Sequence, residues 1–237
     1  MVNSVQQNLE LCCNPLKAGI LGLKERHERE REAVTRAILD AARDLFVSHG
    51  YQEVSIRKIA ERIEYSPAAI YGYFPSKDDI FFALAEEGFR LLFGSGKSRA
   101  TYEDPLDELR AMFLHYYGFS RQHPEYFALM FLDRTVPRIS RDWQRFEFVG
   151  SMKQDMQTRI QRAIDAGIFP AGTSPHAIFR LLLTAVHGAA TMTLCDRLAK
   201  GEDGDALARD VLEAALQGLR AGVPASSHHP SMGLEKD

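Results

Sequence analysis

The sequence predicts an all-α protein, in which an N-terminal three-helix domain with a helix-turn-helix precedes a larger C-terminal helical domain. Apolar residues recur at intervals of three and four from residue 34 almost to the end of the chain, as in amphipathic helices. Stretches that alternate apolar and polar residues, which would predict strands, are nearly absent. With 237 residues, 45% of them apolar, the chain is long enough for a substantial core.

The first long helix is indicated by an apolar stripe that follows a run of mixed charge at residues 24–32. Gly50 comes after the stripe, where helices commonly end in a left-handed residue. We therefore expect this helix to end just before Gly50. The apolar positions of the stripe are Val34, Ala37, Ile38, Ala41, Leu45 and Phe46.

Three serines mark the starts of the next helices. Ser55 is a suitable N-cap for a short helix whose isoleucines face inward. Ser66 is followed by Pro67, which combines an N-cap with proline at the first helical position. Ser76 precedes two aspartates, which are favoured at the positive end of a helix.

The remaining helices are separated by proline and glycine signals. We expect them at about 104–121, 124–133, 141–166, 175–199 and 204–221. The sequence thus predicts a flexible extension at 1–23, a helix-turn-helix domain at 24–77, a second domain at 78–222 and a disordered tail at 223–237.

Composition excludes several classes of protein. The three cysteines, of which Cys12 and Cys13 are adjacent, form neither a disulfide framework nor a zinc site, so we expect a reducing, cytoplasmic compartment. The longest apolar run, Leu181 to Ala190, is interrupted by polar residues, and we expect no membrane span. No Lys or Arg precedes Lys17, which argues against a signal peptide.

The sequence carries no recognisable catalytic motif. A phosphate-binding glycine loop, a metalloprotease motif, a nucleophile elbow and a Cys/His cluster are all missing from it. We therefore expect no catalytic residues, no metal and no cofactor, and the protein is predicted not to be an enzyme. The nearest approach to a catalytic trio is Cys195 with His187 and Asp196, for which a buried structural cysteine or a redox switch is an alternative.

Residues 55–74 predict two short helices joined by a tight turn, as in helix-turn-helix motifs. The second helix begins with the small residues Pro67, Ala68 and Ala69, which would let its N-terminal end approach base edges in the major groove. Tyr71 and Tyr73 follow, with hydroxyl groups that suit phosphate contacts. A purely structural helix-turn-helix, with partly buried tyrosines, is the alternative.

This region resembles the DNA-binding domain of TetR-family regulators over about residues 28–92. The resemblance implies that Ser55 and Lys77 contact phosphates, that Arg57 reaches the backbone or a base, and that the 66–73 helix enters the major groove. The matching segments are Ala42-Arg43-Asp44-Leu45-Phe46, Gly50-Tyr51, Ser55-Ile56-Arg57-Lys58-Ile59-Ala60, Ser66-Pro67-Ala68-Ala69-Ile70-Tyr71-Gly72-Tyr73-Phe74 and Ser76-Lys77-Asp78. The DNA-binding candidates are Ser55, Arg57, Ser66, Pro67, Ala68, Ala69, Tyr71, Tyr73 and Lys77.

Two residues depart from the family pattern. Glu64 stands where the family usually has Gly, at a turn position that favours positive φ. Gly72 replaces a residue that is usually Arg, His or similar, which removes one potential DNA contact.

Charge is distributed unevenly along the chain. The formal net charge of −3 argues against nonspecific coating of nucleic acid. Residues 24–77, however, hold 10 Lys+Arg against 9 Asp+Glu, while residues 78–237 hold 18 against 22. The acidic balance therefore belongs to the second domain, and specific DNA binding by the first needs only a few well-placed groups.

The second domain is rich in aromatic residues between 103 and 148, which indicates a helical core or an apolar cavity for a small molecule. Val186-His187-Gly188 resembles the Val/Trp-His-Gly motif of one TetR subgroup, and a hydrogen-bonded core histidine is the alternative interpretation of His187. The ligand-binding candidates are Phe113, Tyr116, Tyr117, Phe127, Met130, Phe131, Trp143, Phe146, His187 and Thr191.

Small and apolar residues on the last two helices predict a dimer interface. Ala185, Gly188, Ala189 and Met192 form one stripe. With the last helix (Leu207, Val211, Ala214, Ala215 and Gly218) they suggest a four-helix interface, as in the family.

The combined prediction is a homodimeric, sequence-specific DNA-binding regulator, a repressor released from a palindromic operator by a small apolar or aromatic effector. Its partners would be double-stranded DNA, the effector and a second copy of the chain. The alternative is a protein of the same fold that binds small molecules or other proteins without DNA-binding activity.

Overall fold

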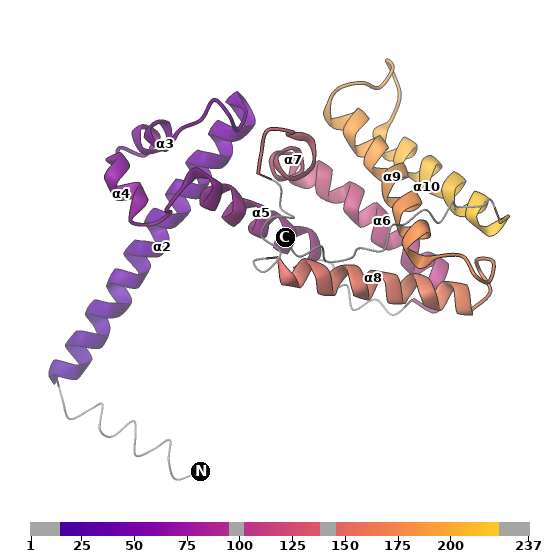
Figure 1. The fold of residues 1–237 in the computed structure, drawn as a ribbon, viewed down its shortest axis with the longest axis horizontal. Coiled ribbons are helices and arrows are strands. Elements are labelled where there is room, and N and C mark those ends of the chain that lie inside the picture. The colour runs from indigo at the N-terminus through magenta and orange to yellow at the C-terminus, as the bar shows by residue number, and fades with distance from the viewer. Residues whose placement is uncertain (1–14, 95–101, 138–145, 223–237) are drawn as a thin grey trace, which may run out of the picture. The chain divides into compact units, whose positions relative to one another are not determined.

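The computed structural model describes residues 15–94, 102–137 and 146–222, and the regular elements in these ranges are helices (Figure 1). They are α2 (Pro15–His49), α3 (Ile56–Arg62), α4 (Pro67–Tyr71), α5 (Lys77–Gly94), α6 (Pro105–Gln122), α7 (Pro124–Phe127), the π-helix η1 (Ala128–Leu132), α8 (Glu147–Asp165), α9 (Pro175–Leu194) and α10 (Gly204–Arg220). The predicted all-α class is confirmed. The chain divides into two compact units, Met1–Ala83 and Leu84–Asp237.

The N-terminal unit begins its helices where the sequence predicts, except at its first residues. Gly50 follows α2 with φ +80° and donates its N–H to Phe46 O. The structure extends α2 back to Pro15, so residues 15–23, which the sequence assigns to a flexible extension, are helical. Residues 24–33, which follow them, are all exposed. This part of α2 therefore packs no apolar face, and its opposite charges pair along the helix, as in Arg26–Glu30.

The start of α5 belongs to the N-terminal unit. Tyr51 donates its hydroxyl proton to the Asp78 carboxylate, and its ring packs edge-on against Phe81 with ring centres 5.8 Å apart. The unit thus ends after Ala83, whereas the sequence places the boundary at the helix start, between residues 77 and 78. The start of α5 is encoded locally in the sequence. The unit to which its first turns belong depends instead on contacts with Tyr51, more than twenty residues away.

The core of the C-terminal unit is formed by α6, α8, α9 and α10. α9 is central to it, since it packs against the other three helices. The buried cluster comprises Leu106, Leu109, Phe113, Ile160, Ala163, Ile164, Phe169, Ile178, Leu182, Val186, Leu212, Leu216 and Leu219. Apart from Phe169, which follows α8, these residues lie on helices that the sequence predicts after residue 104.

α9 ends earlier than the sequence predicts. Its last residue is Leu194, and Asp196 takes a left-handed conformation with φ +52°. Arg197 then donates its N–H to Met192 O at 2.8 Å, which closes the helix end. The predicted end at residue 199 is therefore wrong. Asp196 takes the left-handed position that ends the helix, where glycine is the usual residue, so the sequence carries no signal for this end.

α9 is also long and apolar enough to cross a membrane by length and composition, with a mean hydropathy of 1.4. A core helix of a globular unit meets the same criterion, and α9 buries Ile178, Leu182, Val186 and Ala190 completely. Part of its apolar surface, in contrast, stays exposed, as at Leu181.

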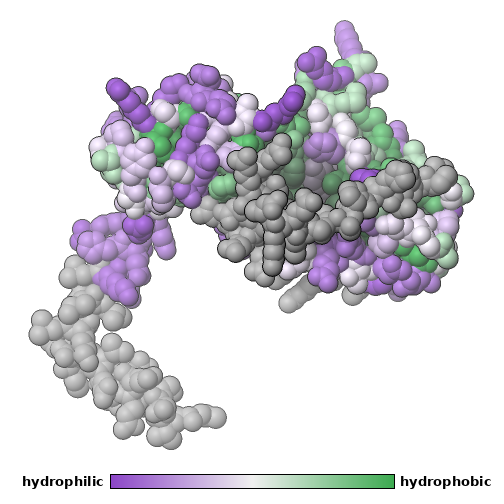
Figure 2. Space-filling model, viewed as in Figure 1, coloured by the Kyte–Doolittle hydropathy of each residue, from purple (hydrophilic) through white to green (hydrophobic). Residues whose placement is uncertain are grey.

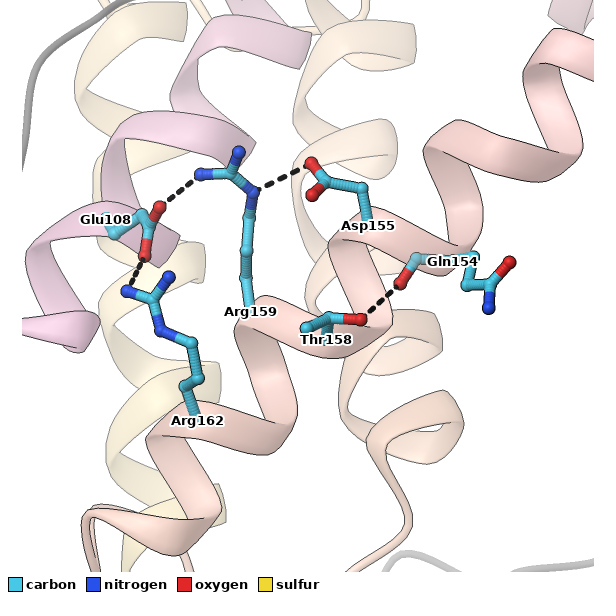
Figure 3. Close-up of polar contacts among 6 residues, drawn as sticks. All are labelled: Glu108, Gln154, Asp155, Thr158, Arg159 and Arg162. Atoms are coloured by element: carbon cyan, nitrogen blue, oxygen red, sulfur yellow. Dashed lines mark hydrogen bonds and ion pairs between the residues drawn. The ribbon is translucent and has the colours of Figure 1, made fainter.

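A buried carboxylate joins α6 to α8. Glu108 is 8% exposed and pairs with both Arg159 and Arg162 from α8 (Figure 3). Arg159 also pairs with Asp155 at 2.9 Å on the exposed side of its guanidinium. The two arginines thus neutralise a charge that would otherwise be costly inside the unit.

Candidate nucleic-acid interface and small-molecule site

Serine side chains cap both helices of the helix-turn-helix. Ser55 Oγ accepts the N–H of Lys58, and Ser66 Oγ accepts the N–H of Ala69, both at 3.2 Å. In this arrangement the hydroxyl oxygen accepts a hydrogen bond from the helix backbone, and the hydroxyl proton remains available to be donated to another group. Both serines are exposed, so each can donate to a phosphate oxygen without releasing its helix.

Helix α4 presents its N-terminal end to solvent. Pro67 and Ala68 are exposed, Ala69 is half-buried, and Tyr71 is 55% exposed. Ile70, in contrast, is fully buried and anchors the five-residue helix in the unit. The exposed residues are small at the first turn and aromatic at the last, which is the shape that the sequence predicts for a helix inserted in the major groove.

Tyr73 lies beyond α4 and is held by Arg31 of α2. The Arg31 guanidinium lies 5.0 Å from the centre of the Tyr73 ring, and Nη2 donates to Gly72 O at 3.4 Å. Sequence reasoning missed Arg31, because it belongs to a run of alternating charges that resembles an ordinary solvated helix face. Gly72, which has no side chain to contact DNA, accepts the Arg31 hydrogen bond through its backbone carbonyl oxygen.

Lys77 holds the loop after α2. Its Nζ donates to Tyr51 O and Val54 O, each at 2.9 Å, and lies 4.1 Å from the centre of the Tyr51 ring. Burial lowers the pKa of the Lys77 ammonium. Two of its three N–H groups thus bond backbone carbonyl oxygens of the loop. The third can make the phosphate contact that the family resemblance implies.

Arg57 lies on the surface of α3. Its side chain is 80% exposed, and Nε donates to Glu61 at 2.8 Å, one turn along the helix. An exposed pair of this kind contributes little to stability, so the guanidinium can exchange Glu61 for a DNA phosphate at small cost.

The turn between α3 and α4 contains a strained residue. Glu64 has φ +60°, the left-handed conformation that the sequence predicts for this position. Tyr65 donates its N–H to Ala60 O at 2.9 Å and Glu64 donates to Glu61 O at 3.3 Å, the two bonds of a Schellman helix end. The backbone therefore requires a conformation that glycine adopts more easily than glutamate.

Replacing Glu64 with Gly is expected to stabilise the protein by about 1 kcal/mol, because it removes the cost of a left-handed L-residue. The melting temperature should rise by about 2–4 °C. Glu64→Ala is the control, since alanine keeps the backbone cost while it removes the charge. Equal stabilisation by both variants in thermal unfolding would show that the carboxylate, and not φ, is the cause.

Four of the ligand-binding candidates come together in the C-terminal unit. The His187 ring lies near three aromatic rings, with centres 5.5 Å from Phe127 and 6.2 Å from both Tyr116 and Phe131. Tyr116 Oη and His187 Nδ1 are 2.9 Å apart. Burial lowers the pKa of His187, so its ring is neutral at neutral pH. Thr191 lies one turn further along α9.

The other ligand-binding candidates lie elsewhere in the unit. Phe113 belongs to the buried core cluster, and Tyr117 donates to Asp205 at 2.9 Å near the start of α10. Met130 is buried in η1, and Phe146 packs edge-on against Phe89 with centres 5.9 Å apart. Trp143 is outside the described residues. The described members of this second set thus make no ring contact with His187. Phe89, however, packs against both Phe146 and Phe131 and so links Phe146 to the His187 group.

The predicted dimer stripe on α9 is exposed at two of its four positions, Gly188 and Met192, while Ala185 is half-buried. Leu181 is 40% exposed and Met192 is 41% exposed, and Gly188 is exposed between them. Figure 2 shows apolar surface over α9 and α10. Ala189, in contrast, is only 2% exposed and faces the core.

A small cavity of about 290 Å³ lies between α6, α7 and α9. Its lining residues are Ser120, Arg121, Pro124, Ala190, Thr193 and Leu194. None of these lining residues is among those predicted to bind the effector. In the described part of the chain, no three His, Cys, Asp or Glu side chains are grouped to hold a metal ion.

These features define a helix-turn-helix DNA-binding regulator with a separate helical domain. Residues 38–84 match the family described as bacterial regulatory proteins, tetR family, and residues 109–215 match the tetracyclin repressor-like C-terminal domain. The chain belongs to the TetR family.

Similar proteins include regulators from several bacteria. The chain is 27% identical over 191 residues to the HTH-type transcriptional repressor AcnR of Corynebacterium diphtheriae, covering 79% of this chain and 92% of that protein. The TetR regulator PfmR of Thermus thermophilus has a TM-score of 0.62 at 21% identity, covering 77% and 98% of the two chains. The regulator FadR of Bacillus subtilis, solved in complex with stearoyl-CoA, has a TM-score of 0.60 at 18% identity, with the same coverage. The two structural likenesses show a shared fold.

Proposed function

We propose that the protein is a homodimeric repressor that binds a palindromic operator through α4 and is released by a small apolar or aromatic effector. The observation that carries the DNA part is the exposed N-terminal end of α4, which Ser66 caps. Ser55 caps α3 in the same way, and both serines keep a hydroxyl proton that is free to donate. The similarity to a repressor over 79% of the chain supports repression. A DNA-binding regulator of bacterial type acts in the cytoplasm, and the named relatives are regulators, which supports a non-enzymatic role.

The effector part rests on the aromatic rings around His187. They offer an uncharged, mostly apolar environment with a few polar groups, as in small-molecule sites. A relative in fold, FadR, was solved with stearoyl-CoA, a ligand with a long apolar chain. α5 is continuous from the N-terminal unit into the C-terminal unit and provides the covalent route between the two functions. A coupling of about 1–3 kcal/mol would weaken operator binding some 5–150-fold.

Replacing Tyr71 with Ala is expected to weaken operator binding about tenfold, because it removes an exposed aromatic contact at the end of the recognition helix. The assay is a mobility shift with a palindrome from the region upstream of the protein's own gene, at several salt concentrations. The melting temperature should not change, because Tyr71 is exposed. Unchanged affinity for the palindrome would contradict the assignment of α4 as the recognition helix.

The same experiment separates the proposal from a module of this fold that does not bind DNA. Such a module would bind none of the upstream fragments, with or without Tyr71. Lys77 is a less suitable probe, because its ammonium also holds Tyr51 O and Val54 O. Loss of DNA binding in Lys77→Ala could therefore reflect a displaced loop.

A further inference from the structure

The hydroxyl of Thr191 behaves differently from other helical threonines. Its Oγ1 is shielded from solvent and has no hydrogen-bond partner among the described residues. Other threonines donate to the carbonyl oxygen four residues earlier, at 2.7–3.0 Å. They are Thr35, Thr158, Thr184 and Thr193. The Thr191 hydroxyl, unlike theirs, thus does not bond the carbonyl oxygen four residues earlier. Leaving a buried hydroxyl without a hydrogen bond costs stability.

His187 provides a second polar atom near this hydroxyl. It precedes Thr191 by one helical turn, so both side chains lie on the same face of α9. Its Nδ1 is joined to Tyr116 Oη, and no described residue bonds its Nε2. With Tyr116 donating to Nδ1, the proton of the neutral ring lies on Nε2. Nε2 and Thr191 Oγ1 are then two donors, one helical turn apart, that have no partner among the described residues.

We propose that the His187–Thr191 pair is the polar end of the effector site, and that it binds an uncharged carbonyl oxygen of an otherwise apolar effector. This inference rests on the proposed function. A carbonyl oxygen has two lone pairs, which match the two donors. The surrounding rings of Tyr116, Phe127 and Phe131 are uncharged. They would hold the apolar body of a ketone, ester or lactone, whereas a carboxylate would be buried there at high cost.

The first test requires no ligand. Thr191→Val keeps the shape of the side chain and removes the unpaired hydroxyl, so the melting temperature of the free protein should rise by about 2–4 °C. Thr158→Val is the control for a helical threonine on an exposed position whose hydroxyl already bonds a carbonyl, here Gln154 O at 3.0 Å (Figure 3). That variant should show no rise. A lower melting temperature in Thr191→Val would overturn the inference, because the hydroxyl would then be part of the fold.

The second test uses matched pairs of small molecules, each an aryl or alkyl ketone and the hydrocarbon with CH₂ in place of the carbonyl. Binding is measured by thermal shift and titration calorimetry with the full chain. The wild type should prefer the ketones, and Thr191→Val should bind them about five- to tenfold more weakly, while Thr191→Ser keeps the preference. Equal binding of ketone and hydrocarbon would overturn the inference but leave an apolar effector site intact. Operator binding, measured separately on the same variants, tests the proposed function.

Discussion

Replacing Gly188 with Glu is expected to convert the proposed dimer into monomers and to weaken binding to the proposed operator on the order of 100-fold or more. Gly188 lies in the exposed apolar stripe of α9, between Leu181 and Met192. A carboxylate there would be buried against a second copy without a partner. Loss of the dimer also removes the avidity that two recognition helices gain from binding one palindrome together.

The structure makes this variant a clean test of dimerisation. A Cβ at Gly188 would meet no atom within 4 Å, and Gly is the poorest helix former after Pro, so the monomer should fold at least as well. Gly150→Glu on α8 is the matched control, because that glycine is also helical, exposed and without neighbours within 4 Å. In sedimentation, Gly188→Glu should be a monomer and Gly150→Glu should behave as the wild type. In mobility shifts, only Gly188→Glu should lose operator affinity. A Gly188→Glu protein that remains dimeric would exclude this face as the interface.

The double substitution Arg159→Met and Arg162→Met is expected to lower the free energy of unfolding by about 2–4 kcal/mol. Glu108 would lose both of its cationic partners while it stays almost fully buried (Figure 3). The melting temperature should fall by about 5–10 °C. Denaturant unfolding of the wild type and the variant measures the difference.

Two further variants identify the cause. Adding Glu108→Met to the double variant should recover most of the lost stability, because the buried charge is then removed with its partners. Asp155→Ala should change stability by less than about 0.5 kcal/mol, since Asp155 pairs with Arg159 where its side chain is 64% exposed. If the triple variant were as unstable as the double variant, lost packing of the arginine stems would be the cause.

The helix-turn-helix was predictable because its signals are local. Ser55 and Ser66 cap amide groups three residues away, and Gly50 ends its helix through its own φ. Such interactions are encoded in short stretches of sequence, whatever the rest of the chain does. The end of α9 shows the limit of this reasoning, because Asp196 takes a left-handed conformation that sequence patterns rarely assign to it.

The grouping of residues at the proposed effector site was only partly predictable. Aromatic composition identifies the region, but packing decides that Tyr116, Phe127 and Phe131 surround His187 while Phe113 joins the core cluster. Residues with the same apolar character separate into different groups according to the face of the helix they occupy. Neighbours in sequence therefore need not share a site.

The sequence by itself determined the helical class and most helix starts, including the start of α4, which we propose binds DNA, since each follows from periodicity and from caps that span one turn. Only the tertiary structure decided which groups those elements bring together. It placed Arg31 on the Tyr73 ring, directed the Lys77 ammonium to carbonyls 23 and 26 residues away, and left the Thr191 hydroxyl without a partner among the described residues. The physical reason is that a side chain's partner depends on which elements pack side by side, and that is a property of the whole unit.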